Sequence, residues 1–121
     1  MKLTLKQIVE SQEALQHLMD QRLPAKTAYR LQRDLRKVLE EIETFKKVQD
    51  AKVREYGIEV PEAPGQLQIP PEKIPEYMKD IGDLINQEIE LDLHPVDLED
   101  LKDVDMTLRD VLLLSYLIKE E

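Results

Sequence analysis

The chain has 121 residues, no Cys, no Trp and one Phe, and 36% of its residues are charged. This length suits one domain, and the missing residue types exclude disulfides, thiolate metal sites and an aromatic platform for single-stranded nucleic acid. The net charge of −9 argues against non-specific binding to nucleic acid or to anionic membranes, and the lack of a signal region or of about 18 consecutive apolar residues predicts a cytoplasmic protein.

The first predicted helix runs from Thr4 to about Asp20. Thr4 and Gln7 have the spacing of a capping box, in which each side chain bonds the backbone N–H of the other residue. Apolar residues then recur on one side of the helix, at Leu5, Ile8, Val9, Leu15, Leu18 and Met19. A helix with one apolar side needs a packing partner.

The second predicted helix is long, because no Gly or Pro interrupts the chain between Pro24 and Gly57. Its first two thirds carry a heptad pattern of Ala28, Leu31, Leu35, Val38, Ile42 and Phe45. About thirty helical residues extend for about 45–50 Å, whereas a compact domain of this length has a radius of gyration of about 14 Å. Either the C-terminal half folds back along this helix or another subunit covers it, and we expect an oligomer that uses it.

Residues 58–71 contain four prolines and are predicted to be a linker, in which residues 67–69 make a short strand. The next helix is expected from Pro75 to about Gln87, because Pro75 cannot lie deep in a helix that begins at Pro71.

Acidic and apolar residues alternate over 88–93, which predicts a half-buried strand that pairs with residues 67–69. Residues 96–105 are expected to form an acidic loop with one helical turn at 97–101. Thr107 then caps a last helix, whose residues 111–118 are apolar nearly all round. Such a helix is buried at the centre of a domain or forms a subunit interface.

These elements predict an α+β fold that is mainly α. Residues 1–57 are expected to form an N-terminal helical hairpin with one long helix. Residues 58–121 are expected to form a small α+β half, with a two-stranded element and an apolar C-terminal helix. This half packs on or beside the hairpin, within a single domain.

Charge is unevenly distributed along the chain, with a net +5 over residues 22–37 and a net −7 over residues 88–110. Within the basic stretch, one face of the long helix carries Lys26, Tyr29, Arg30, Arg33 and Lys37. Cations beside an aromatic ring suit phosphate recognition and base stacking, so this face is a candidate site for a small anionic ligand. Alternatively, Tyr29 packs in the hairpin core, and the cations pair with Asp34, Glu40 and Glu41 or with the acidic C-terminal half.

We expect a homo-oligomer, because the long helix and the C-terminal helix both carry more apolar surface than a small hairpin covers. The predicted interface residues are Leu35, Ile42, Phe45, Leu112, Leu113, Tyr116 and Leu117. Subunits that pair along the long helix would bring several basic faces together into one shared pocket.

No pattern in the sequence indicates catalysis. His17 and His94 lie far apart and in no ligand spacing, and neither Ser11 nor Ser115 has the context of a nucleophile elbow. Three scattered glycines make no phosphate loop, and the acidic run 97–105 lacks the glycine and the terminal glutamate of a calcium-binding loop. We therefore expect no enzyme activity, no cofactor and no metal.

Several short motifs follow one another along nearly the whole chain. They are Leu3-Thr4, Leu23-Pro24-Ala25-Lys26 with Tyr29, Tyr56-Gly57, Ile69-Pro70-Pro71-Glu72-Lys73, the acidic strand Glu88–Leu93, and Thr107 before a Leu-rich helix. In this order they resemble a family of small phage and prophage proteins of Gram-positive bacteria, a domain of unknown function. Residues 31–37 match the family only as generally basic and amphipathic, and the low glycine content and the Pro61–Pro64 segment depart from it. The resemblance implies a phage-encoded protein of the host cytoplasm and supplies no mechanism.

Three hypotheses for function follow. The first is a non-catalytic counter-defence protein that sequesters a nucleotide-type signal of host immunity at an oligomer interface, since an otherwise acidic protein carries a basic, Tyr-containing face. The second is a phage assembly chaperone or accessory virion protein, which uses the long helix and the apolar C-terminus for protein contacts. The third is an acidic inhibitor of a host defence enzyme, in which residues 88–110 imitate phosphate charge and binding weakens with salt.

Overall fold

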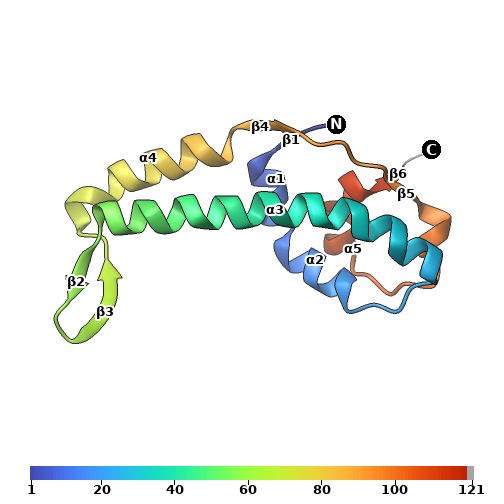
Figure 1. Ribbon diagram of the computed structural model, residues 1–121, viewed down its shortest axis with the longest axis horizontal. Coiled ribbons are helices and arrows are strands. Elements are labelled where there is room, and N and C mark those ends of the chain that lie inside the picture. Colours follow the sequence, from blue (N-terminus) through green and yellow to red (C-terminus); the bar gives the residue numbers. More distant parts are fainter. Residues whose placement is uncertain (120–121) are drawn as a thin grey trace.

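Helix α3 (Ala25–Tyr56) is the axis of an elongated molecule and runs along most of its length (Figure 1). The computed structural model describes residues 1–119 and confirms an α+β fold that is mainly α. Residues 1–45 and 88–119 gather around the N-terminal part of α3, and we call them the head. Residues 46–87, which include the C-terminal part of α3, form a narrow extension. We call this extension the stalk.

The chain begins with strand β1 (Lys2–Thr4), followed by helices α1 (Leu5–Glu10) and α2 (Gln12–Met19). The expected capping box is confirmed, because Gln7 N donates to Thr4 Oγ1 at 3.2 Å and Thr4 N donates to Gln7 Oε1 at 2.9 Å. The prediction of one continuous helix was wrong, since Ser11 divides it. The Ser11 hydroxyl donates to the Ile8 carbonyl at 2.7 Å, and such bonds compete with regular helical geometry.

The long helix has the predicted bounds. Pro24 precedes its first turn, and Gly57 follows its last turn in an extended conformation, with φ −80° and ψ 153°. A Cβ atom on Gly57 would lie 2.4 Å from the Val53 carbonyl oxygen, so this helix end has no room for a side chain. The side of α3 that faces the core is formed by Leu31, Val38, Ile42 and Phe45.

The stalk consists of more than a linker. Strands β2 (Ile58–Val60) and β3 (Ala63–Gln68) form an antiparallel hairpin at its end. After a 3₁₀ turn, η1 (Pro71–Lys73), helix α4 (Ile74–Ile85) returns beside α3, and Pro75 lies in its first turn as expected (Figure 1). The C-terminal half thus folds back along the long helix within one chain, which was the less favoured of the two alternatives.

The predicted pairing between residues 67–69 and 88–93 was wrong. Strand β4 (Glu88–Glu90) pairs antiparallel with β1, and Leu3 lies opposite Ile89. Leu67 instead lies opposite Glu59 in the β2–β3 hairpin. Segments close in sequence pair at the end of the stalk, while residues 88–90 pair with β1 in the head.

The last α-helix of the chain is shorter than predicted. Strand β5 (Val96–Asp97) and the expected turn η2 (Leu98–Leu101) precede helix α5 (Leu108–Leu113), where Asp110 N donates to Thr107 Oγ1 at 3.1 Å. A 3₁₀ turn η3 (Ser115–Leu117) then leads into strand β6 (Ile118–Lys119), which pairs parallel with β5. An α-helix that continued to residue 118 would prevent β6 from pairing with β5.

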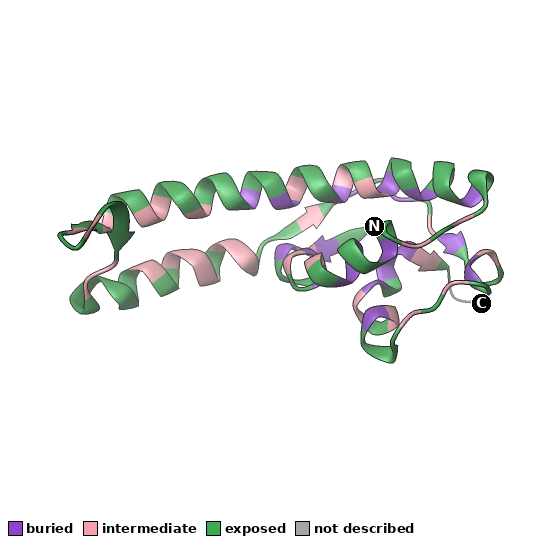
Figure 2. Ribbon diagram, turned by 90° about the horizontal axis from the view of Figure 1, so that it is seen from below, coloured by how far each residue is buried: buried purple, intermediate pink, exposed green. Residues whose placement is uncertain are grey.

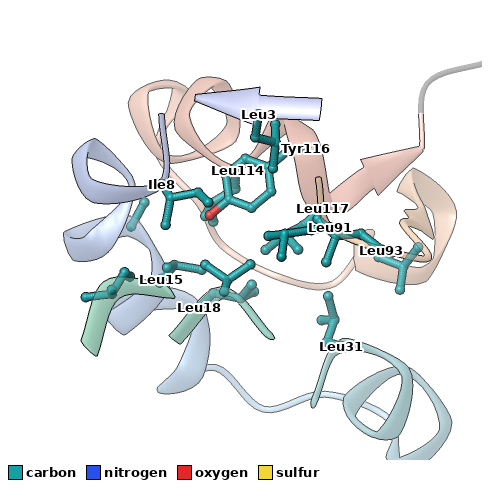
Figure 3. Close-up of a cluster of buried hydrophobic side chains, with 14 of the residues drawn as sticks. Leu3, Ile8, Leu15, Leu18, Leu31, Leu91, Leu93, Leu114, Tyr116 and Leu117 are labelled. Carbon is teal, nitrogen blue, oxygen red and sulfur yellow. The ribbon is translucent and has the colours of Figure 1, made fainter. Parts of the chain in front are cut away.

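One hydrophobic core holds the head together, with buried residues from both halves of the chain (Figures 2 and 3). Its fully buried side chains include Ile8, Leu15, Leu31, Val38, Val96, Leu114 and Leu117. Residues 1–57 and 58–119 therefore share one core. Among residues 1–119, no helix combines the length and the apolar character needed to cross a bilayer.

Candidate anion-binding site

The five residues of the predicted basic face lie together on the first turns of α3. Tyr29 is 65% exposed, and the side chain of Arg30 is 52% exposed. Lys26 and Arg33 are also exposed, and Lys37 is half-buried. Tyr29 therefore does not pack in the hairpin core, and its ring is accessible beside the cations.

The acidic C-terminal segment borders this face without covering it. Arg30 Nη1 lies 3.9 Å from Oδ2 of Asp100. Lys37 Nζ donates to the Asp92 carbonyl and lies 3.9 Å from the carboxylate of the same residue. The other cations of the face have no ion-pair partner among residues 1–119. Exposed pairs at such distances are worth little, so a ligand can replace them at small cost.

A pocket of about 220 Å³ opens at the edge of the basic face. It is lined by Arg30, Arg33, Asp34, His94 and Pro95. The first three belong to α3, and the last two belong to the segment between β4 and β5 that crosses over the helix. The basic face thus continues into a hollow with walls from two parts of the chain.

Asp34 is the unusual member of this pocket, because its side chain is fully buried. Its Oδ1 accepts a hydrogen bond from the backbone N–H of His94 at 2.9 Å, across 60 residues of sequence. Its Oδ2 is buried and has no hydrogen-bond donor in the described part of the chain. A buried acceptor without a donor costs free energy, and a ligand that brings a donor recovers it.

Sequence reasoning missed Asp34 and His94 as members of the site. Asp34 was visible as the single acid among six cations in residues 22–37, but it was interpreted as an ion-pair partner. His94 carries no sequence signal, since only the fold brings it to α3. The assembled site offers two guanidinium groups for an anion and one carboxylate oxygen, Oδ2 of Asp34, that lacks a donor.

The other histidine lies away from this site. His17 Nδ1 is 3.0 Å from Oδ2 of the buried Asp110, which ties α2 to α5. The hydrogen bond to Asp110, together with the charge of that carboxylate, raises the pKa of His17 above its ordinary value. Among residues 1–119, no group of three or more His, Asp or Glu side chains is placed to hold a metal ion.

The fold divides the seven residues expected at an oligomer interface. Those buried within the chain itself are Ile42, Phe45, Tyr116 and Leu117. Leu112 is 66% exposed, and Leu35 and Leu113 are half-buried. The helical spacing of apolar residues indicates that they are buried, but it does not show whether the same chain or another subunit buries them. The four buried side chains are already occupied by intramolecular packing.

No protein-family model, no curated protein and no solved structure matches this chain. The resemblance to small phage proteins therefore rests on the short motifs in the sequence.

Proposed function

We propose that this chain is a phage-encoded, non-catalytic counter-defence protein that sequesters a nucleotide-type immune signal in the cytoplasm of its bacterial host. The observation that carries the proposal is the exposed set of Tyr29, Arg30 and Arg33 beside a pocket in which a buried Asp34 oxygen lacks a donor. The phage origin is supported by the order of the sequence motifs.

Each part of a nucleotide has a matching group in this site. Guanidinium groups bind phosphate oxygens in paired, charge-assisted hydrogen bonds. An exposed Tyr ring offers a surface on which a base stacks. The base amino group or a ribose hydroxyl donates the hydrogen bond that Oδ2 of Asp34 lacks. A nucleotide brings both an anion and donors, whereas inorganic phosphate brings mainly the anion, so nucleotides are expected to bind more tightly.

The first experiment is native mass spectrometry of the protein purified from bacteria that carry nucleotide-signalling defence systems. A releasable extra mass after denaturing extraction supports sequestration. Calorimetric titrations with adenosine and guanosine phosphates, and with inorganic phosphate, then compare the affinities directly. The absence of any extra mass, together with equal or absent binding of all these probes, contradicts the proposal.

A charge reversal assigns the binding to the site. Arg33→Glu is expected to weaken nucleotide binding by about a hundredfold or more, since it removes one charged contact and adds a repulsion. Arg54→Glu is the matched control, because Arg54 is an exposed cation on the same helix, outside the site. Equal binding by both variants would show that the basic face is not the binding site.

A second candidate function is protein contact during phage assembly, favoured by the stalk. Its exposed apolar residues lie outside the hydrophobic core and include Ile58, Leu67, Ile74 and Met78. In this case the protein co-purifies with a capsid or tail protein from infected cells and carries no small ligand. Loss of that protein from the Met78→Glu variant, with retention by Arg33→Glu, would support assembly over sequestration.

A further inference from the structure

An apolar groove of about 680 Å³ runs between α2 and α3 in the head. Its apolar lining includes Leu18, Met19, Leu23, Leu31, Leu35 and Leu39. Met19 is 55% exposed and Leu39 is 38% exposed, so large apolar side chains reach the surface here. A smaller hollow of about 300 Å³ adjoins the groove and shares Met19, Leu39 and Glu43 with it. An apolar surface of this kind on a highly charged chain indicates a docking site.

The groove lies on a different side of α3 from the basic face. At about 100° of rotation per residue, Leu35 and Arg33 point about 200° apart around the helix axis. The centre of the groove and Arg33 therefore lie on opposite sides of α3, while Arg36, which also lines the groove, lies one turn from Arg33.

We propose that the groove is occupied by a second copy of this chain, with the two α3 helices antiparallel. Opposite charges lie about one turn on either side of Leu39, where Arg36 precedes it and Glu43 follows it. A two-fold axis that passes near Leu39, perpendicular to α3, makes the two helices antiparallel. Each Arg36 then faces Glu43 of the other copy. A parallel arrangement would instead bring like charges together, which disfavours it.

Glu40 also lines the groove beside the axis and approaches Glu40 of the other copy, but its exposure to solvent weakens this repulsion. The existing contacts of Arg36 and Glu43 do not oppose the pairing. Among residues 1–119, Arg36 has no ion-pair partner. Glu43 Oε1 lies 3.6 Å from Nζ of Lys47 on the same exposed helix surface, and such a pair contributes little. Of the seven interface residues expected from the sequence, Leu35 is the one that lines this groove. The dimer therefore uses a surface other than the C-terminal helix.

The test is the dimer dissociation constant, measured by sedimentation equilibrium over a range of protein concentrations. The wild-type chain is expected to dimerise, and Leu39→Glu is expected to raise the constant by about a hundredfold or more, since a charge enters the centre of the groove. Met78→Glu is the matched control, because it makes a similar change at an exposed apolar residue of the stalk. Circular dichroism checks that each variant is folded.

Charge reversal tests the antiparallel register. Arg36→Glu alone is expected to raise the dimer dissociation constant by about tenfold. The new glutamate of each copy then faces Glu43 of the other copy, so the interface holds two pairs of like charges. Adding Glu43→Arg to this variant is expected to restore the dimer. A wild-type chain that stays monomeric overturns the proposal. The proposal is also overturned if the Leu39→Glu variant dimerises like the wild type, or if Leu112→Glu dissociates the dimer instead. It is likewise overturned if the double variant Arg36→Glu with Glu43→Arg does not regain the wild-type dissociation constant.

Discussion

Ser11 and Tyr116 meet in the core of the head, although 105 residues separate them in the sequence. Their hydroxyl oxygens lie 2.7 Å apart, and the Ser11 hydroxyl also lies 2.7 Å from the Ile8 carbonyl. A serine has one hydroxyl hydrogen. Since Ser11 donates it to Ile8, Tyr116 must be the donor in the bond between the two side chains. Burial of Tyr116 raises the pKa of its hydroxyl, which keeps this donor in place.

Replacing Ser11 tests this arrangement. Ser11→Ala leaves the buried Tyr116 hydroxyl without an acceptor and is expected to lower the free energy of unfolding by about 1–3 kcal/mol. In a Tyr116→Phe background the same change is expected to cost less, because no orphaned hydroxyl remains. Urea unfolding of the four proteins measures the difference. Equal costs in the two backgrounds would contradict the hydrogen bond.

The contact between His17 and Asp110 makes the stability of the head depend on pH. A histidine with a raised pKa stabilises the fold while it is protonated in both states, below the ordinary value of about 6.5. This contribution is lost as pH rises through the raised pKa of the folded state. The advantage of wild type over His17→Gln is therefore expected to be larger at about pH 5.5 than at about pH 8.5. Thermal unfolding of both proteins checks the sign, and a pH-independent difference would refute it.

At the scale of elements, the stalk depends on a few polar contacts. Tyr56 Oη donates to Oδ2 of Asp80 at 2.6 Å, and Lys52 Nζ lies 3.5 Å from the same oxygen. The hydrogen bond to Asp80 raises the pKa of Tyr56 to about 12, and the same bond lowers the pKa of Asp80. No residue of α4 is fully buried, so these contacts join α4 to α3 with little core beneath them (Figure 2).

Tyr56→Phe is expected to loosen the stalk without disturbing the head. It removes the donor to Asp80, and a region with few buried contacts opens at lower free energy than a core. Hydrogen exchange at backbone amides of α4 should accelerate, while amides of α1 and of the head half of α3 keep their rates. Acceleration in the head as well would show that the two parts unfold together.

The helices were largely predictable from local signals, whereas strands β1, β2, β5 and β6 were not predicted. The bounds of α3 follow from Pro24 and Gly57, and the starts of α1 and α5 follow from the caps at Thr4 and Thr107. Strand partners were not predictable, because residues 67–69 and 88–93 have similar alternation and pairing depends on which segments meet in space. The break at Ser11 was also missed, since its cause is a hydroxyl hydrogen bond rather than a change in period.

At the scale of the whole molecule, the sequence predicts the basic residues of the site but not the pocket they border. Lys26, Tyr29, Arg30 and Arg33 share a face because they share a helix. The pocket needs the segment around His94 to cross α3, and no periodicity encodes this long-range contact. The same limit applies to the groove, because its two walls belong to helices whose packing angle is set by the shared core.

The pairing of β1 with β4 also orders events during synthesis of the chain. Leu3 meets Ile89 and the core needs Leu114 and Leu117, so the head cannot close while only the first two helices and α3 have left the ribosome. For that interval the apolar side of α3 has no cover except α1 and α2. A nascent chain in this state is open to chaperones and to proteases, and α3 reaches its final surroundings only when residues up to about Leu117 have been translated.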